Sequence, residues 1–80
     1  MTADVVWIQE AAEKVNRGES EVVLDFSSVL RIDADVVGAM EKLAGLADGK
    51  PVKVVLRAVN TDVYRVLKLL KLTRRFTFVT

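Results

Sequence analysis

Three carboxylates are the side chains whose type and spacing could support chemistry in this sequence. Asp25 follows a short apolar run, and Asp33 and Asp35 stand two residues apart before the next apolar stretch. If Asp25 ended a strand, the three would meet at the carboxyl edge of a sheet, where open α/β folds bind ligands. Carboxylates placed together can hold a magnesium ion, or divide the roles of general acid and general base.

The rest of the composition argues against both uses. The sequence has no histidine and no cysteine, which removes the commonest general base, the commonest metal ligand and any thiolate site. Receiver domains, which carry such an acidic magnesium site, have five βα units and a lysine after a late strand. Here the second apolar run ends in Arg57 and Ala58. We therefore expect no enzyme, no catalytic residue, no metal site and no cofactor.

Length and composition indicate one folded domain over residues 1–80. The chain is 51% hydrophobic and 29% charged, which is typical of a globular protein. Its apolar runs are far shorter than the ~20 residues needed to cross a bilayer. The N-terminal residues MTADVVWIQE lack the basic and apolar regions of a signal peptide. We expect a cytoplasmic protein with no direct membrane insertion.

Apolar residues recur at helical spacing in three segments. The first helix is expected over about residues 4–16, capped by Thr2 or Asp4 and ended by Gly18. The second opens at Asp33 or Ala34 and ends at Asp48-Gly49. The third begins at Asn60 or Thr61. The residues expected to face inward in the second and third helices are Val36, Met40, Leu43, Ala47, Val63, Val66, Leu67 and Leu70.

Three strands alternate with these helices, over residues 21–26, 51–57 and 76–79. The consecutive apolar residues at 22–24 favour a first strand that is covered on both faces, in the interior of a parallel sheet. Pro51 stands at the start of the second strand, where proline is tolerated. The order α-β-α-β-α-β predicts an α/β fold, a short parallel sheet with packed helices and right-handed crossovers.

Residues 22–40, VVLDFSSVLRIDADVVGAM, resemble the central signature of STAS domains. That signature is a buried strand ending in Asp, a short loop, and an Ile-Asp-Ser-Ser-Gly turn that opens a helix. Residues 22–25 match the strand, Ile32-Asp33 match the turn, and Gly38 matches a glycine within the helix. Further along the chain, residues 59–63 and 69–72 resemble the later part of the domain. The resemblance spans nearly the whole chain and implies a STAS core.

Two departures from the family pattern bear on assembly. Family members usually begin with one or two strands before the first helix, and many end with another helix. Neither is visible here, so we expect a core that lacks the N-terminal strands. The strand at 21–26 would then be unpaired on one side, which invites strand addition from a second copy. We expect a homo-oligomer for this reason, and a self-associating assembly module is an alternative function.

The resemblance implies a non-catalytic protein–protein interaction module. It fits an anti-sigma factor antagonist, which binds a kinase-like anti-sigma factor. Alternatively, it fits the cytoplasmic STAS subunit of a phospholipid-transport ABC system, whose partner is the transporter ATPase. The expected partner-binding residues lie in the loop and at the start of the second helix: Ser27, Ser28, Arg31, Asp33, Ala34, Asp35, Val36, Val37 and Gly38.

The family's switch residue is replaced in this sequence. In regulatory STAS domains the second serine of the turn is phosphorylated by the partner kinase. When the turn is aligned on Asp33, that position is Asp35, with Ala34 at the first serine and Val36 at the glycine. Aspartate has no hydroxyl, but its charge partly imitates phosphoserine. The simpler interpretation is an N-cap followed by an acid that complements the helix dipole, which alone accounts for both aspartates.

Charge is distributed unevenly along the chain. Residues 1–50 carry five Lys/Arg and ten Asp/Glu, whereas residues 51–80 carry seven Lys/Arg and only Asp62. A basic stripe of Arg65, Lys68, Lys71, Arg74 and Arg75 could attract nucleic acid or anionic lipid. No aromatic residue is interleaved for base stacking, so we expect a solvated helix face and no nucleic-acid partner. Trp7 and Tyr64 are expected in packing roles, Trp7 partly exposed.

Overall fold

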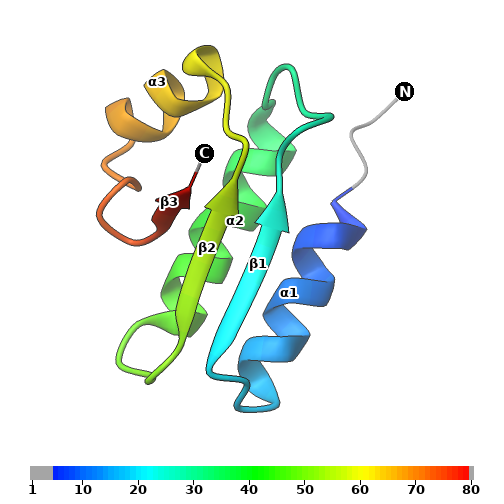
Figure 1. Cartoon of the computed structure of the whole chain (residues 1–80), viewed down its shortest axis with the longest axis vertical. Helices are drawn as coiled ribbons and strands as arrows, with labels where there is room; N and C mark the ends of the chain where they lie inside the picture. Colours follow the sequence, from blue (N-terminus) through cyan, green and yellow to red (C-terminus); the bar gives the residue numbers. More distant parts are fainter. Residues whose placement is uncertain (1–4, 80) are drawn as a thin grey trace.

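The structure is a computed structural model that describes residues 5–79, and its elements alternate as the sequence predicts (Figure 1). In chain order they are α1 (Val6–Asn16), β1 (Glu21–Asp25), α2 (Ala34–Ala47), β2 (Lys53–Arg57), α3 (Thr61–Leu69) and β3 (Thr77–Val79). The predicted α/β fold with a short parallel sheet is therefore confirmed.

The sheet is parallel, and β2 is its central strand. Its strand order is β1-β2-β3, with Val23 opposite Val55 and Val55 opposite Thr77. Among the described residues β1 pairs only with β2, so it is an edge strand. The interior position inferred from the apolar run is wrong, whereas the unpaired side expected from the missing N-terminal strands is present in the described part of the chain.

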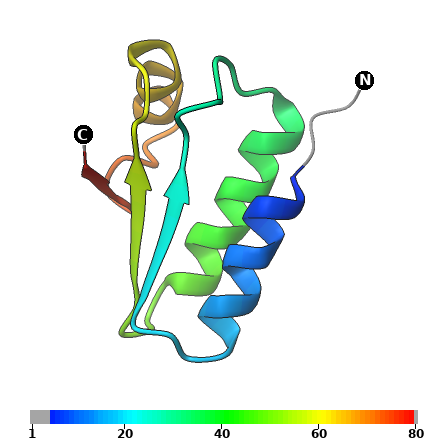
Figure 2. The same ribbon diagram turned by 45° about the vertical axis from the view of Figure 1, so that its right-hand side comes forward.

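One face of the sheet is covered by helices. No described helix covers the other, open face, although Val55 on that face is only 6% exposed. α1 and α2 lie side by side on the covered face (Figure 2). α3 adjoins the same face, because Tyr64 contacts Phe78 with ring centroids 5.2 Å apart and Phe78 lies in register with buried Leu56. The core between the layers includes Ile8, Met40, Leu43, Leu56 and Leu67.

The open face corrects a second expectation about β1. Its residues alternate between exposed and buried, with Val22 and Leu24 in the core and Val23 48% exposed. In Figure 1 the strands β1 and β2 pass in front of α2, and no described element covers them on the near side. Three consecutive apolar residues therefore mark a half-covered strand, not one that is covered on both faces.

Helix boundaries follow local signals closely. Asp33 and Asn60 are the N-caps of α2 and α3. α1 ends where Gly18 adopts a positive φ of 82°, and the N–H of Glu19 donates to the carbonyl oxygen of Lys14 across that turn. The caps predicted at Thr2 and Asp4 lie outside the described residues.

Several details differ from expectation. β1 ends at Asp25, one residue before the predicted end of the first strand. β2 begins at Lys53, so Pro51 precedes it, and β3 begins at Thr77, so the buried Phe76 precedes it. Leu70 was expected to face inward but is 42% exposed. The reason is that α3 ends at Leu69. Leu70 lies beyond the helix, so the helical spacing that predicted its direction no longer applies.

Candidate functional site

The loop between β1 and α2 starts at Asp25, whose carboxylate organises the turn. Asp25 Oδ1 accepts a hydrogen bond from the N–H of Ser27 at 2.8 Å, and the N–H of Val29 donates to the carbonyl of Phe26 at 3.0 Å. The Ser27 N–H, and then the Ser27 hydroxyl and nearby Arg57, hold the pKa of Asp25 below its usual value. Asp25 is thus an ionised turn-former at the base of the loop.

The loop ends at Asp33, which caps α2. Its Oδ1 accepts from the N–H of Val36 at 3.0 Å, and its carbonyl oxygen accepts the first helical bond from Val37 at 2.9 Å. Asp35 follows in the first turn, where its negative charge complements the helix dipole. The geometry matches the simpler interpretation, in which Asp33 is the N-cap and the charge of Asp35 complements the helix dipole. The Asp35 side chain is exposed to solvent.

The acidic residues do not assemble into a metal site. Asp25 and Asp33 each accept a backbone N–H at opposite ends of the loop. Across residues 5–79 the structure contains no group of three or more acidic side chains placed to hold a metal ion. The magnesium-site hypothesis therefore finds no support in the described residues.

Asn60 fixes the loop from the outside. Its side-chain Nδ2 donates to the carbonyl oxygens of Val29 at 3.0 Å and Leu30 at 3.2 Å. The same side chain caps α3, because its Oδ1 accepts from the N–H of Val63 at 2.8 Å. One amide thus joins the start of α3 to the middle of the loop, across about thirty residues of sequence.

The loop presents Leu30 to solvent, a residue that sequence reasoning missed. Its side chain is 76% exposed, while the neighbours Val29 and Ile32 turn inward and pack against the core. Leu30 and Arg31 flank a shallow hollow shared with Asn60, Thr61 and Asp62. An irregular loop has no periodicity, so the sequence gives no signal that separates Leu30 from its inward-facing neighbours.

The predicted partner-binding residues divide by exposure. Those on the surface are Ser27, Ser28, Arg31, Asp33, Ala34 and Asp35, and those half-buried are Val37 and Gly38. Val36 is only 4% exposed and belongs to the core. A partner that approaches this end of the molecule therefore meets the loop and the first turn of α2 but not Val36.

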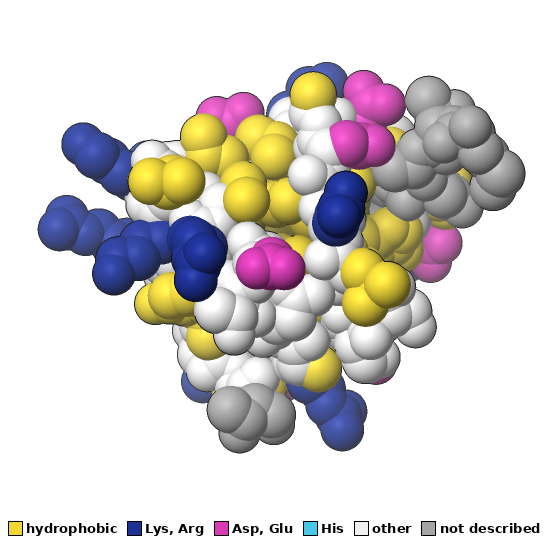
Figure 3. Space-filling view, turned by 90° about the horizontal axis from the view of Figure 1, so that it is seen from above, with side chains coloured by type: hydrophobic (Ala, Val, Ile, Leu, Met, Phe, Trp, Pro, Cys, Tyr) yellow, Lys and Arg dark blue, Asp and Glu magenta, His cyan; other side chains and the backbone are white. Residues whose placement is uncertain are grey.

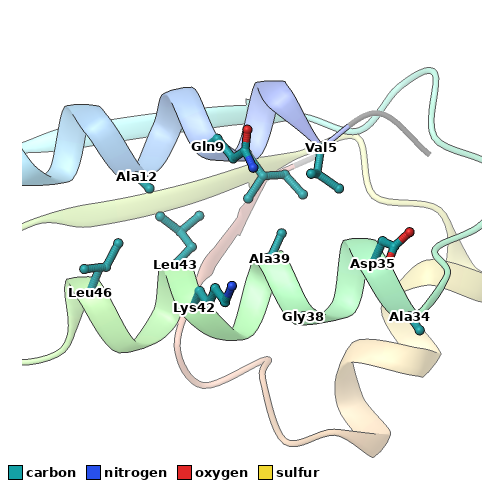
Figure 4. A pocket seen from close by; sticks show the side chains of 11 residues that line it. Val5, Gln9, Ala12, Ala34, Asp35, Gly38, Ala39, Lys42, Leu43 and Leu46 are labelled. Atoms are coloured by element: carbon teal, nitrogen blue, oxygen red, sulfur yellow. The ribbon is translucent and has the colours of Figure 1, made fainter. Parts of the chain in front are cut away.

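The surface continues from α2 into a groove beside α1 (Figure 4). The groove has a volume of about 410 Å³, and Ile8 and Leu43 are among the buried residues that line it. Ala34, Asp35 and Gly38 line it from α2, and a Cβ added at Gly38 would meet nothing within 4 Å. Small side chains on both helices leave the hollow open, and they give it a mainly apolar lining.

The arrangement offers an exposed leucine beside charged residues, on a loop held at both ends and in its middle. Such a surface is suited to recognition of another macromolecule, because a few exposed apolar side chains supply most of the binding energy of an interface.

Comparison with known proteins fits this geometry. No curated protein matches the chain. A crystal structure from Thermotoga maritima, of a protein described as an anti-sigma factor antagonist, shares the fold with a TM-score of 0.75 at 23% sequence identity. The match covers 94% of this chain and 66% of that protein, so the chain spans just under two thirds of its length. The profile described as the STAS domain matches residues 4–80. The chain therefore belongs to the STAS domain family.

Proposed function

We propose that the chain is a non-catalytic protein-binding module of the anti-sigma factor antagonist type, whose partner is a kinase-like anti-sigma factor. The docking surface is the loop from Ser27 to Ile32 together with the first turn of α2. The single observation that carries this proposal is the exposure of Leu30 at the centre of a hydrogen-bonded loop.

The physical argument rests on how little the loop has to change on binding. Hydrogen bonds from Asn60, and to Asp25 and Asp33, already order its backbone. Binding then costs less conformational entropy, so more of the energy of burying Leu30 appears as affinity. Arg31 and Asp62 line the hollow beside the leucine with opposite charges, which select the orientation of the partner.

Asp35 holds the position of the family's phosphoacceptor and gives the module one charge state. We expect a cognate kinase with ATP to leave residues 33–38 of the natural protein unmodified, because no hydroxyl is present there. The variant Asp35→Ser should become a substrate at that residue, which mass spectrometry would reveal. Phosphate on residues 33–38 of the natural protein would contradict this part of the proposal.

The test of function is an affinity measurement with kinase-like anti-sigma factors encoded in the same genome. Leu30→Ala should weaken binding at least about tenfold, as truncation of a central apolar anchor does. Leu69→Ala is the matched control, because Leu69 is equally exposed but lies on α3. The transporter ATPase of a lipid-transport system, measured in parallel, tests the alternative. Equal binding by both variants would contradict the proposed surface.

We also propose that β1 recruits a second copy of the chain by strand addition. The carbonyl oxygen of Ser20 accepts from the N–H of Lys53, and the N–H of Phe26 donates to the carbonyl oxygen of Arg57. The backbone N–H and C=O groups of the even-numbered residues of β1 therefore point toward β2. The backbone groups of Val23 and its odd-numbered neighbours therefore point toward the open edge.

The variant Val23→Pro removes one outward-facing N–H, a change that edge strands tolerate. It should shift the equilibrium toward monomer in size-exclusion chromatography with light scattering. A natural chain that stays monomeric at high concentration would contradict the self-association.

A further inference from the structure

The outer side of α3 and the turn that follows it form a basic surface that the proposed function does not use. We call this the α3 basic surface. Its residues are Arg65, Lys68, Leu69, Leu70, Lys71, Arg74 and Arg75, all of them exposed. Figure 3 shows Lys and Arg side chains gathered on the side of the molecule where α3 lies, with apolar side chains between them.

Two leucines stand among these cations. Leu69 is 78% exposed and Leu70 is 42% exposed, whereas the inner side of α3 buries Val63 and Leu67. The chain turns at Lys71, which has a φ of 60°, and the Leu72 N–H donates to the Leu67 carbonyl. This turn returns Leu72 to the core and leaves the two leucines outside. The sequence suggested that these cations simply form the solvated face of a helix. That interpretation does not account for two exposed leucines among them at the end of α3.

Most of the cations are not neutralised within the protein. Arg75 lies 3.8 Å from Asp48, and Glu41 lines a small hollow together with Lys71 and Arg75. Asp62 stands in the first turn of α3. Within residues 5–79, Arg65, Lys68 and Arg74 form no ion pair. Their charge is available to an anionic partner.

The shape and the side chains of the α3 basic surface favour one kind of anionic partner over others. Single-stranded nucleic acid binds where aromatic rings are free to stack, but the Tyr64 ring packs edge-on against Phe78. The hollow beside Leu70 is lined by Lys71 and Arg75 but also by Glu41, so it holds charges of both signs and is a poor site for a run of acidic residues. The exposed leucines instead suit a deformable surface with an apolar layer beneath anionic groups.

We propose that the α3 basic surface docks the protein onto an anionic lipid bilayer, with Leu69 and Leu70 entering the boundary between headgroups and acyl chains. Docking is peripheral, because no helix within residues 5–79 is long and apolar enough to cross a membrane. The α3 basic surface and the Leu30 loop involve different residues, so the two bindings are tested separately.

Vesicle sedimentation tests the proposal with the intact chain. Binding should be strong on vesicles with roughly 30 mol% phosphatidylglycerol, negligible on pure phosphatidylcholine, and much weaker when salt rises from about 50 to about 300 mM. Each cation near an anionic surface is worth about 1 kcal/mol, or about fivefold. The variant Arg65→Ala/Lys68→Ala/Arg74→Ala should therefore lower the partition coefficient about 100-fold.

A matched triple variant provides the control. Lys42→Ala/Lys50→Ala/Lys53→Ala removes the same net charge from exposed positions away from α3 and should keep binding within about threefold. Leu69→Ala should reduce binding about fivefold through lost apolar burial. Circular dichroism confirms that the variants fold.

Three results would overturn the proposal. They are equal binding to neutral vesicles, equal losses for both triple variants, and tighter binding of duplex DNA or polyglutamate than of anionic vesicles. The last result would assign the same surface to a different macromolecule.

Discussion

Asn60 Nδ2 lies 3.0 Å from the carbonyl oxygen of Val29, and this contact joins α3 to the proposed docking loop. Because the same amide caps α3, the position of the loop depends on where α3 begins. The loop therefore has little backbone freedom, although most of its side chains are exposed. Its rigidity comes from tertiary hydrogen bonds and not from secondary structure.

Substitution of Asn60 should separate capping from loop fixation. Asn60→Ala removes both and should lower the free energy of unfolding by about 1–2 kcal/mol in a urea titration. Asn60→Ser keeps a capping oxygen but is too short to donate to the carbonyls of Val29 and Leu30, so it should destabilise less than Asn60→Ala. Both variants should speed hydrogen exchange in the loop. Equal stability loss in the two would contradict the separation.

The cap at Asp33 should stabilise α2 measurably. Asp33→Ala should cost about 1 kcal/mol, whereas Asp33→Ser should recover most of it, because serine also accepts a hydrogen bond at an N-cap. Asp35→Ala should cost less, since Asp35 interacts with the helix dipole alone. Thermal unfolding of the three variants checks this order. A larger loss of stability for Asp35→Ala than for Asp33→Ala would contradict this order and would mean that Asp35 makes a further structural contact.

Ala58 is held in the left-handed region. Its φ is 59°, just after the end of β2. The hydrogen bond from its N–H to the Val79 carbonyl, at 3.2 Å, helps to hold this backbone conformation. Ala58→Gly should therefore raise stability by about 0.5–1 kcal/mol. Ala39→Gly, within α2, is the control and should lower it by about 1 kcal/mol. A loss at both positions would mean that strain at Ala58 is negligible.

Stability should fall in acid partly through Asp25. Because its pKa in the folded protein is below the value of 3.8 for an unperturbed aspartate, the ionised carboxylate stabilises the fold above that value. The contribution is lost as the pH falls through the lowered pKa. The difference in unfolding free energy between the natural protein and Asp25→Asn should therefore shrink between about pH 5 and about pH 2. A constant difference over that range would exclude this role.

The sequence contains most of the local information and little of the long-range information. The order of the elements and the N-caps of α2 and α3 were predictable, because Asp33 and Asn60 act on residues three positions away. The apolar run of β1 did not reveal its edge position, since an edge strand and an interior strand can share the same run; only the comparison with the family pattern pointed to an unpaired side. The exposure of Leu30 depends on loop packing, and the contact between Asn60 and Val29 joins residues that no local pattern relates.

Hydrogen exchange on the complex with a kinase-like anti-sigma factor tests the central claim most directly. We predict that binding slows exchange in the segment from Ser27 to Gly38, while the amides of α3 beyond Val66 keep their free-state rates. Protection confined to α3, to the open face of β2 or to the edge of β1, with the loop unchanged, would contradict the assignment of the Leu30 loop as the docking surface.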